Sequence, residues 1–515
     1  ACEPFARLFS LKGGNMMKEI YFPYEIPQDY IRMYTHLANL FFERSKIRRK
    51  QHGDYTVELF VEKDRETYRG KGTLTTNEKK YETTYEEKIE ARWLSEQHQE
   101  KRIYSRLFLQ LLEQETGMHQ HWGVLTGIRP MKLYHRHYQK YGDHALVKKE
   151  MSDSYRISDE KLEMMERIHE VQLAAIPDLY DLKKEVSIYI GIPFCPTKCA
   201  YCTFPAYAIQ SHRKTGRVNT FLDALHEEIR AIGHILKEED VRITTIYFGG
   251  GTPTSIEADE MDALYEVMYD SFPHMDKVRE ITVEAGRPDT ITVEKLEVLK
   301  KWGIDRISVN PQSYTDATLK AIGRHHTVEE TIDKFWLARK HGMNNINMDL
   351  IIGLPNEGIE EFQHSLDETE KMQPESVTIH TLSFKRASDM TKNKERYQVA
   401  DRTTVEEMMK MGERWTKNNN YIPYYLYRQK NILGNLENVG YSKRGEESLY
   451  NILIMEEAQT IIGIGSGASS KFVERNGKIT QYLNPKEPVA YTLAHQKVAK
   501  EKGELVKELL KKLKN

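Results

Sequence analysis

Three of the chain's four cysteines lie within eight residues, in the segment GIPFCPTKCAYCTFP at positions 191–205. Cys195, Cys199 and Cys202 have the spacing C-x3-C-x2-C, which wraps a short loop around one centre. A structural zinc site needs four ligands, usually as two separated pairs, and a redox disulfide needs two cysteines. Three thiolates without a fourth suit an iron–sulfur cluster that leaves one iron open to a small molecule. Buried free thiols are the alternative.

Glycine and polar residues further along the chain could complete a binding site around such a cluster. FGGGTPTS at 248–255 would let the backbone approach a ligand closely, or would make only a tight turn. Glu284, Gln312 and Asp349 each fall at or just past the end of an expected strand, so their side chains should lie close together at one end of the sheet. Together they suit an amino acid joined to a ribose, whereas each acid alone could be a buried structural group. Arg324 could pair with a carboxylate or be a solvated charge at a helix end.

The strands that must position these residues alternate with amphipathic helices from Val186 onward. Short, nearly continuous apolar runs separated by helices indicate βαβ units and a parallel sheet covered on both faces. The cysteines follow the first strand, at the end that carries the chemistry in (β/α) barrels. Six such units favour a partial (β/α)6 barrel. The expected strands are VSIYIGI (186–192), ITTIYF (243–248), EITVEA (280–285), DRISVN (305–310), INMDLII (346–352) and SVTIHTL (376–382).

The residues before the barrel are expected to form an N-terminal accessory α/β domain at 17–180. The alternation in YTVELFVE predicts a strand at 55–62. Apolar stripes predict helices at 102–117 and 157–172. The segment IPDLYDLKKE, 176–185, is expected to be a linker to the barrel.

The fold class is therefore α/β, with a barrel at 186–385 between the N-terminal domain and a C-terminal elaboration at 386–515. The C-terminal region is expected to complete the substrate site and to end in an amphipathic helix at 504–515. Residues 1–15, which include Cys2, are set aside as an upstream extension.

Composition excludes several classes of function. The 75 lysines and arginines nearly balance the 77 aspartates and glutamates, so no basic excess indicates a nucleic-acid partner. No apolar run approaches the about 20 residues of a membrane span, and no signal peptide is visible. A secreted disulfide protein would have a dispersed, even set of cysteines. We expect a cytoplasmic protein.

The motifs also resemble a known family. CPTKCAYC resembles the C-x3-C-x-φ-C signature of radical S-adenosylmethionine (radical SAM) enzymes, in which φ is aromatic and is here Tyr201. FGGGTPTS, VEAGRPD, VNPQS, IGRHHT and NMDLIIGLPNE follow in the order seen in the oxygen-independent coproporphyrinogen III oxidase-like family. The resemblance is strong over 186–385 and weaker beyond. The first 170 residues, including WGVLTGIRPMKL, resemble the extra N-terminal domain of one subgroup.

This resemblance implies cofactors, a partner and a set of site residues. A [4Fe–4S] cluster would be held by Cys195, Cys199 and Cys202, with S-adenosylmethionine (SAM) on its open iron. Flavodoxin or ferredoxin would supply an electron. The residues that the resemblance implies as SAM contacts are Tyr189, Tyr201, Gly250, Gly251, Thr252, Glu284, Gln312, Arg324 and Asp349.

The activity that the resemblance implies is oxygen-independent oxidative decarboxylation of coproporphyrinogen III to protoporphyrinogen IX, a step of porphyrin and haem biosynthesis. Lys385 and Arg386 are expected to meet this anionic tetrapyrrole, and Tyr207 to supply an aromatic wall. Phe204 stands where characterised oxidases have a further cysteine, and GNLENVGYS lacks the His and Trp of a haem motif. The alternatives are a radical SAM enzyme that acts on haem or another tetrapyrrole, and a haem-trafficking protein.

Overall fold

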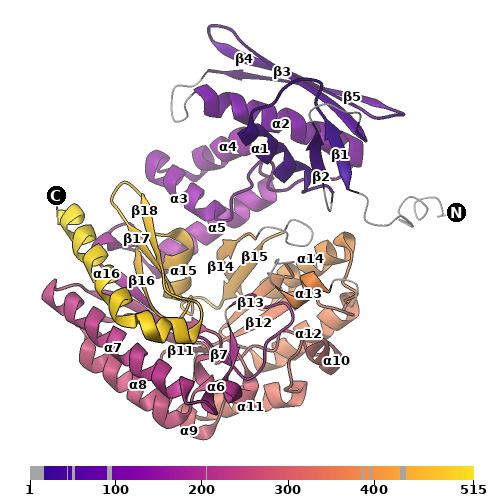
Figure 1. The fold of residues 1–515 in the computed structure, drawn as a ribbon. Helices are drawn as coiled ribbons and strands as arrows, with labels where there is room; N and C mark the ends of the chain where they lie inside the picture. The colour runs from indigo at the N-terminus through magenta and orange to yellow at the C-terminus, as the bar shows by residue number, and fades with distance from the viewer. Residues whose placement is uncertain are drawn as a thin grey trace. The chain divides into compact units, whose positions relative to one another are not determined.

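The structure, a computed structural model, describes residues 17–42, 45–48, 53–89, 96–204, 206–383, 388–393, 397–429 and 436–514. The chain divides into two compact units (Figure 1). The first contains the residues up to Gly127 and Arg136–Glu166, and the second contains Ile128–His135 and Arg167–Asn515. The boundaries fall inside or beside two helices, α3 (Pro130–Tyr141) and α5 (Asp159–Ala175).

The first unit packs helices against a five-stranded sheet with the order β2-β1-β3-β4-β5. The strand expected at 55–62 is β3, in which Tyr55, Val57 and Leu59 are buried alternately, as a strand with one covered face requires. The helix expected at 102–117 is α2, which buries Leu107 and Leu111 against this sheet. The elements are β1 (Lys18–Tyr21), α1 (Gln28–Ala38), β2 (Ser45–Arg48), β3 (Tyr55–Lys63), β4 (Thr67–Thr75), β5 (Lys80–Lys88), α2 (Glu96–Thr116) and α4 (His144–Tyr155).

The second unit is built on an 11-stranded sheet whose centre is the predicted barrel. Its six central strands run parallel to one another, which confirms the partial (β/α)6 architecture. The first of them buries nearly every side chain, because both faces of the sheet are covered, and this explains its continuous apolar sequence. The six strands are β6 (Val186–Ile192), β9 (Ile243–Gly250), β10 (Glu280–Val283), β11 (Arg306–Ser308), β12 (Ile346–Ile352) and β13 (Ser376–Thr381).

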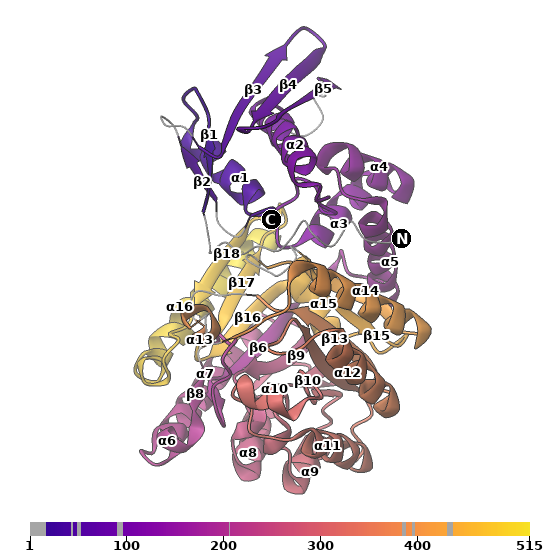
Figure 2. The same cartoon turned by 90° about the vertical axis from the view of Figure 1, so that its right-hand side faces the viewer.

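Helices follow these strands and cover the sheet. Figures 1 and 2 show α8, α9 and α11 along one face of it. The apolar stripe of α7 is buried at Leu222, Leu225, Ile229 and Ile232, as predicted. No helix in the described ranges is both long enough and apolar enough to cross a membrane. The helices are α6 (Ile209–Arg213), α7 (Arg217–Glu238), α8 (Ala258–Ser271), α9 (Val293–Lys301), α10 (Asp316–Ala321), α11 (Val328–Lys340), α12 (Ile359–Met372), α13 (Asp389–Lys392), α14 (Arg402–Asn418), α15 (Leu449–Glu456) and α16 (Pro488–Lys514).

The C-terminal part of the chain extends the barrel sheet at both of its edges. β16 (Thr460–Gly465) pairs in parallel with β6 and carries the antiparallel strands β17 (Ser469–Val473) and β18 (Ile479–Leu483). At the other edge, β15 (Asn438–Ser442) runs antiparallel to β13 and pairs with β14 (Ile422–Tyr427). The C-terminal residues therefore share one sheet with the barrel. A separate two-stranded ribbon joins β7 (Phe194–Cys195) to β8 (Tyr207–Ala208).

The segment expected to be a linker is packed inside the second unit. Ile176, Leu179 and Leu182 are buried in a cluster with Tyr424 and Leu453. A short 3-10 turn, η1 (Leu182–Lys184), leads directly into β6. The first barrel strand is thus anchored at its amino end by apolar contacts.

A buried ion pair fastens the last helix to the barrel. Lys502 of α16 and Glu228 of α7 are fully buried and paired, and Lys502 also donates to the carbonyl of Gly463. Glu228 accepts further hydrogen bonds from the Tyr491 hydroxyl at 2.5 Å and the Gly465 amide at 2.8 Å. Because the partners satisfy both charges, the pair can persist without water.

We expect Lys502→Met to lower the free energy of unfolding by about 3–5 kcal/mol, because Glu228 would be left as a buried carboxylate without its cation. Lys507→Met is the matched control, since Lys507 also joins α16 to α7, through Glu238, but both side chains are more than 40% exposed, at 44% and 47%. The control should change stability by at most about 1 kcal/mol. Urea unfolding followed by circular dichroism measures both variants. Equal losses would contradict the assigned role of the buried pair.

Candidate active site

The three clustered cysteines lie on the loop that leaves the carboxyl end of β6. Cys195 lies on β7, and Cys199 and Cys202 lie in the turn that follows, where the Cys202 amide donates to the Cys199 carbonyl at 3.1 Å. None of the three forms a disulfide in the described structure, and all are partly exposed. The Cys195 Sγ lies 3.4 Å from the Thr252 hydroxyl oxygen. The Ala200 amide donates to the Ile322 carbonyl at 2.9 Å, which ties the loop to the region after α10.

The glycine segment after β9 packs its backbone directly on the backbone of the cysteine loop. The Gly251 amide donates to the Ile192 carbonyl at 2.8 Å, and the Thr252 amide donates to the Phe194 carbonyl at 2.7 Å. A Cβ atom at Gly251 would lie 2.5 Å from the Phe194 carbonyl oxygen, and Gly250 has a φ of +111°. Glycine is therefore required here to let two segments of the chain meet, besides any approach to a ligand.

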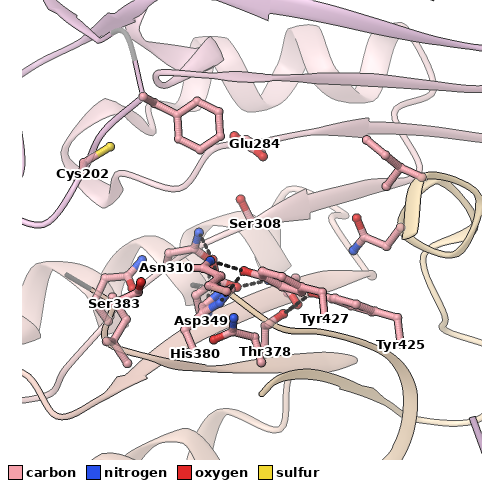
Figure 3. A pocket seen from close by; sticks show the side chains of 18 of the residues that line it. Cys202, Glu284, Ser308, Asn310, Asp349, Thr378, His380, Ser383, Tyr425 and Tyr427 are labelled. Carbon is pink, nitrogen blue, oxygen red and sulfur yellow. Dashed lines mark hydrogen bonds and ion pairs between the residues drawn. The ribbon is translucent and has the colours of Figure 1, made fainter. Parts of the chain in front are cut away.

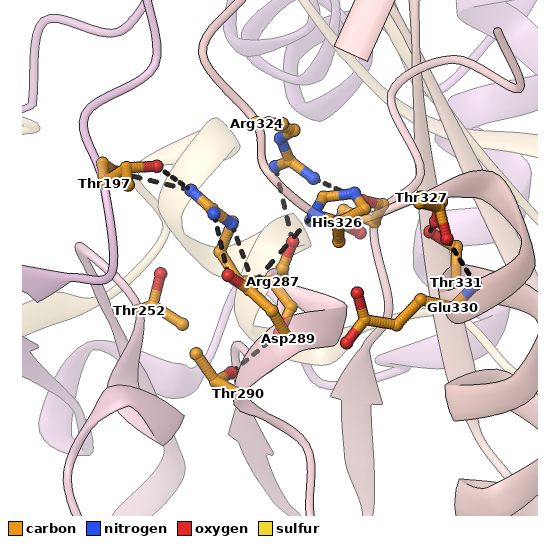
Figure 4. A network of polar contacts seen from close by, with 12 residues as sticks. Thr197, Thr252, Arg287, Asp289, Thr290, Arg324, His326, Thr327, Glu330 and Thr331 are labelled. Atoms are coloured by element: carbon orange, nitrogen blue, oxygen red, sulfur yellow. Dashed lines mark hydrogen bonds and ion pairs between the residues drawn. The ribbon is translucent and has the colours of Figure 1, made fainter. Parts of the chain in front are cut away.

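Two buried guanidinium groups lie close to the cysteine loop (Figure 4). Arg287 donates to the Thr197 hydroxyl at 3.1 Å, pairs with Asp289 at 2.9 Å and lies 4.0 Å from the Cys199 Sγ. Burial raises the pKa of the Cys195 thiol to about 11, and Arg287 is among the groups that oppose this rise. Arg287 belongs to the motif VEAGRPD and follows β10 just as Glu284 does, but the sequence alone assigns it no role.

Arg324 is also buried, and two of its guanidinium nitrogens donate to the protein backbone. Its guanidinium donates to the carbonyls of Asn310 at 2.6 Å and Gly286 at 3.3 Å. These carbonyls take two of its nitrogens, whereas its buried Nε has no hydrogen-bond partner. The pairing of Arg324 with a ligand carboxylate stays a prediction. The neighbouring His326 is buried as well, and burial lowers its pKa to about 3.

A cavity of about 430 Å³ opens at the carboxyl ends of the barrel strands, beside the cysteine loop. Figure 3 shows Cys202 and Glu284 on one side of it and Asp349, His380 and Tyr427 on the other. Three residues implied as SAM contacts, Gly251, Thr252 and Arg324, are not among its described lining. The implied SAM contacts that do line it are Tyr189, Tyr201, Gly250, Glu284, Gln312 and Asp349.

Glu284 and Gln312 are unusual for buried polar residues. Burial raises the pKa of the Glu284 carboxyl to about 7, partly opposed by the Tyr247 hydroxyl, which donates to it at 2.6 Å. Gln312 has a left-handed backbone with a φ of +66°, which L-residues adopt rarely. Its side-chain oxygen is buried and has no hydrogen-bond partner. A strained backbone that holds an unsatisfied acceptor in a cavity is a feature of ligand sites.

Part of the cavity wall comes from the C-terminal region. It includes two residues of β14, Tyr425 and Tyr427, and Tyr450 of α15. At the rim, the Phe204 side chain is 55% exposed and also lines the cavity. From the sequence, Phe204 is notable only because it occupies the place of a missing cysteine. Its aromatic character beside a cluster motif was a signal for a binding surface, and the structure adds that it is exposed.

Other residues expected at the substrate site have different outcomes. Tyr207, expected as the aromatic wall, is not among the described residues that line the cavity, and its ring contacts His212 instead. Lys385 and Arg386 lie outside the described residues, so their contact with an anionic substrate stays a prediction.

The spacing of the thiols can be compared with what different metal centres need. Within the described loop, the three sulfur atoms do not all lie within 4.8 Å of one another. Thiolates on one tetrahedral metal ion lie about 3.8 Å apart, because each metal–sulfur bond is about 2.3 Å long. The three thiols are therefore not arranged around a single tetrahedral ion. Three thiolate donors on one loop, without a fourth, suit an iron–sulfur cluster, and the unpaired oxygen of Gln312 suits a polar ligand in the cavity.

Comparison with known proteins agrees with this site. Residues 189–369 match the radical SAM superfamily. Over 490 residues, which are 93% of this chain and 96% of the relative, the chain is 56% identical to the oxygen-independent coproporphyrinogen-III oxidase-like protein HemZ of Bacillus subtilis (strain 168). The chain belongs to this oxidase-like family of radical SAM proteins. The predicted family and α/β fold class are thus confirmed.

Two further likenesses are more distant. The chain is 35% identical over 196 residues to the heme chaperone HemW of Bacillus subtilis (strain 168), which covers 38% of this chain and 50% of that protein. A solved structure, the radical SAM coproporphyrinogen III oxidase HemN from Escherichia coli, is similar at 18% identity and a TM-score of 0.48, covering 64% of this chain and 72% of the other.

Membership of the radical SAM superfamily also establishes the cofactors. Its proteins use a [4Fe–4S] cluster and SAM, as the cysteine motif predicted. Which residues hold each cofactor stays a prediction, and it can be tested residue by residue.

We expect anaerobic reconstitution to yield about four irons per chain, with the visible absorbance of an iron–sulfur cluster. Cys195→Ala, Cys199→Ala and Cys202→Ala should each abolish it, because two thiolates cannot hold the cluster. Cys2→Ala, outside the described residues, is the matched control and should change neither iron content nor spectrum. Zinc at full occupancy without visible absorbance would contradict the assignment of the three cysteines.

We expect Gln312→Met to weaken SAM binding by about 5- to 100-fold, because the variant keeps the side-chain volume but loses the polar atoms that face the cavity. Its free energy of unfolding should not fall, since the lost oxygen has no partner within the protein. Gln363→Met, at an exposed position of α12, is the matched control. Equilibrium dialysis with labelled SAM measures affinity. Wild-type affinity in Gln312→Met would remove Gln312 from the SAM site.

Proposed function

We propose that the protein is a radical SAM oxidoreductase that converts coproporphyrinogen III to protoporphyrinogen IX by oxygen-independent oxidative decarboxylation. The observation that carries this proposal is the 56% identity, over 93% of the chain, to a relative named as an oxygen-independent coproporphyrinogen-III oxidase-like protein. Because the match spans 96% of that relative, both the barrel and the flanking regions support it.

In this proposal the cysteine loop holds the cluster and the cavity holds the remaining ligands. When bound, the cluster and SAM together supply a carbon radical that can take a hydrogen atom from an unactivated C–H bond. Arg287 and Arg324 offset the negative charge that three thiolates bring to the loop. Glu284, Gln312 and Asp349 orient the polar groups of SAM from the ends of neighbouring strands.

The rest of the cavity would hold the tetrapyrrole. Phe204, Ile351 and Leu382 provide apolar surface for the macrocycle on the barrel side. For each vinyl group formed, a propionate loses one hydrogen atom to the radical, one molecule of carbon dioxide and one electron. The protein therefore needs an electron donor to begin each cycle, for which we propose flavodoxin or ferredoxin, and an acceptor for the electron released.

A haem-binding role is the second candidate, and the likeness to the heme chaperone HemW favours it. That likeness covers 38% of this chain and 50% of the relative, much less than the likeness to the oxidase-like protein. The stretch GNLENVGYS, 434–442, also lacks the His and Trp of the haem motif. A chaperone would bind haem stably without consuming SAM.

We expect the reconstituted protein, incubated anaerobically with coproporphyrinogen III, reductant and SAM, to yield products that have lost one and two molecules of carbon dioxide with two hydrogens each. Mass spectrometry measures the products, and chromatography measures 5′-deoxyadenosine. The Cys199→Ala variant is the control and should form neither. SAM cleavage with coproporphyrinogen III returned unchanged would refute the decarboxylase proposal, and haem would be the next substrate to test.

A further inference from the structure

The described lining of the cavity carries acidic groups but contains no lysine or arginine. Its carboxyl groups belong to Glu284 and Asp349, and its one imidazole belongs to His380. A substrate that carries ionised carboxylates would be repelled by Asp349 unless a positive group lay between them. Among the described lining residues, His380 is the side chain whose protonated form is a cation.

His380 lies at the centre of a chain of polar contacts that crosses the cavity wall (Figure 3). It is a residue of β13, and its side chain is 26% exposed. The Nε2 atom lies 3.6 Å from the Asp349 Oδ2, and the Nδ1 atom lies 3.3 Å from the Tyr427 hydroxyl. Gln429 donates to the same hydroxyl at 3.3 Å. The imidazole therefore bridges an acid of the barrel and a phenol of β14.

Asp349 is held in place by partners of its own. Asn310 donates to it at 2.9 Å and Asn347 at 2.8 Å. Burial alone would raise the pKa of this carboxyl, but His380, followed by Asn347 and Thr378, holds it below its usual range. Asp349 is thus a carboxylate that fixes the Nε2 side of His380, which leaves the Nδ1 side directed at Tyr427.

Two proton donors then face one place on the wall. The His380 Nδ1 can donate when it carries a proton, and the Tyr427 hydroxyl, whose pKa burial raises, keeps its proton. Their mutual contact at 3.3 Å is long for a hydrogen bond, so an anionic oxygen can replace it at little cost. A charged and a neutral donor side by side match the two oxygens of one carboxylate.

We propose that His380, oriented by Asp349, and Tyr427 together bind one carboxylate of the substrate and so select a carboxylated tetrapyrrole. This inference rests on the proposed function and names the residues that would bind one acid group of the substrate. In this arrangement the substrate carboxylate would lie close to SAM, because Asp349, which contacts His380, is also expected to contact SAM.

The test compares two probes with the same macrocycle: coproporphyrin III, with four carboxylates, and its tetramethyl ester, in which four neutral methyl ester groups replace them. Binding to the reconstituted full-length protein is followed by the absorbance of the porphyrin. We expect His380→Gln, which keeps a hydrogen-bonding side chain without the charge, to weaken coproporphyrin III binding by about 10- to 150-fold and to leave the ester unchanged. Tyr427→Phe should weaken only the acid, by about 2- to 10-fold.

His364→Gln is the matched control, because His364 is an exposed barrel histidine on α12 and receives the same substitution. It should bind both probes as the wild type does. The inference is overturned if His380→Gln weakens binding of the acid and the ester equally, or if it weakens binding of neither. It is also overturned if the wild-type protein does not bind the acid more tightly than the ester. Carboxylate binding that depends on His380, without turnover of coproporphyrinogen III, would refute the proposed reaction and support this inference.

Discussion

The contact between the backbones of residues 192–194 and 250–252 is the constraint on which the rest of the site depends. It joins the ends of the first two barrel strands so closely that a Cβ at Gly251 would lie 2.5 Å from a carbonyl oxygen. The same contact directs Thr252 toward Cys195. Because both segments follow paired strands of one sheet, the sheet fixes the position of the cysteine loop. A cluster loop held in this way needs little rearrangement to receive iron.

The cavity beside this loop is formed by two parts of the chain that are distant in sequence. The barrel strands supply acids and amides, and β14 and α15 supply tyrosines. Since β14 and β15 belong to the same sheet as the barrel, the far wall is as firmly held as the near one. The C-terminal region is thus part of the site's framework.

Much of this arrangement could be predicted from the sequence, and the reasons are local. Apolar runs separated by amphipathic helices predicted all six barrel strands. The spacing of Cys195, Cys199 and Cys202 predicted an iron–sulfur cluster, and the resemblance of their motif to the radical SAM signature implied SAM. The direction of Arg324 could not be predicted, because whether a guanidinium meets a ligand or a carbonyl depends on tertiary packing. The contact between His380 and Tyr427 could not be predicted for the same reason, since Tyr427 lies on a strand that no local pattern assigns to the barrel. The packed segment 176–185 looked like a linker because its apolar residues bind surfaces that come much later in the chain.

The pairing of β6 with β16 has a consequence for how the protein is made. About 270 residues separate Ile192 from Thr460, so the first barrel strand emerges from the ribosome long before its second neighbour. At a synthesis rate of about 5–20 residues per second, this delay is roughly 13–54 s. During that time one edge of β6, immediately before the three thiols, is unpaired and open to other partners. Iron and sulfide that reached the nascent chain during this time would meet a sheet that still lacks β16.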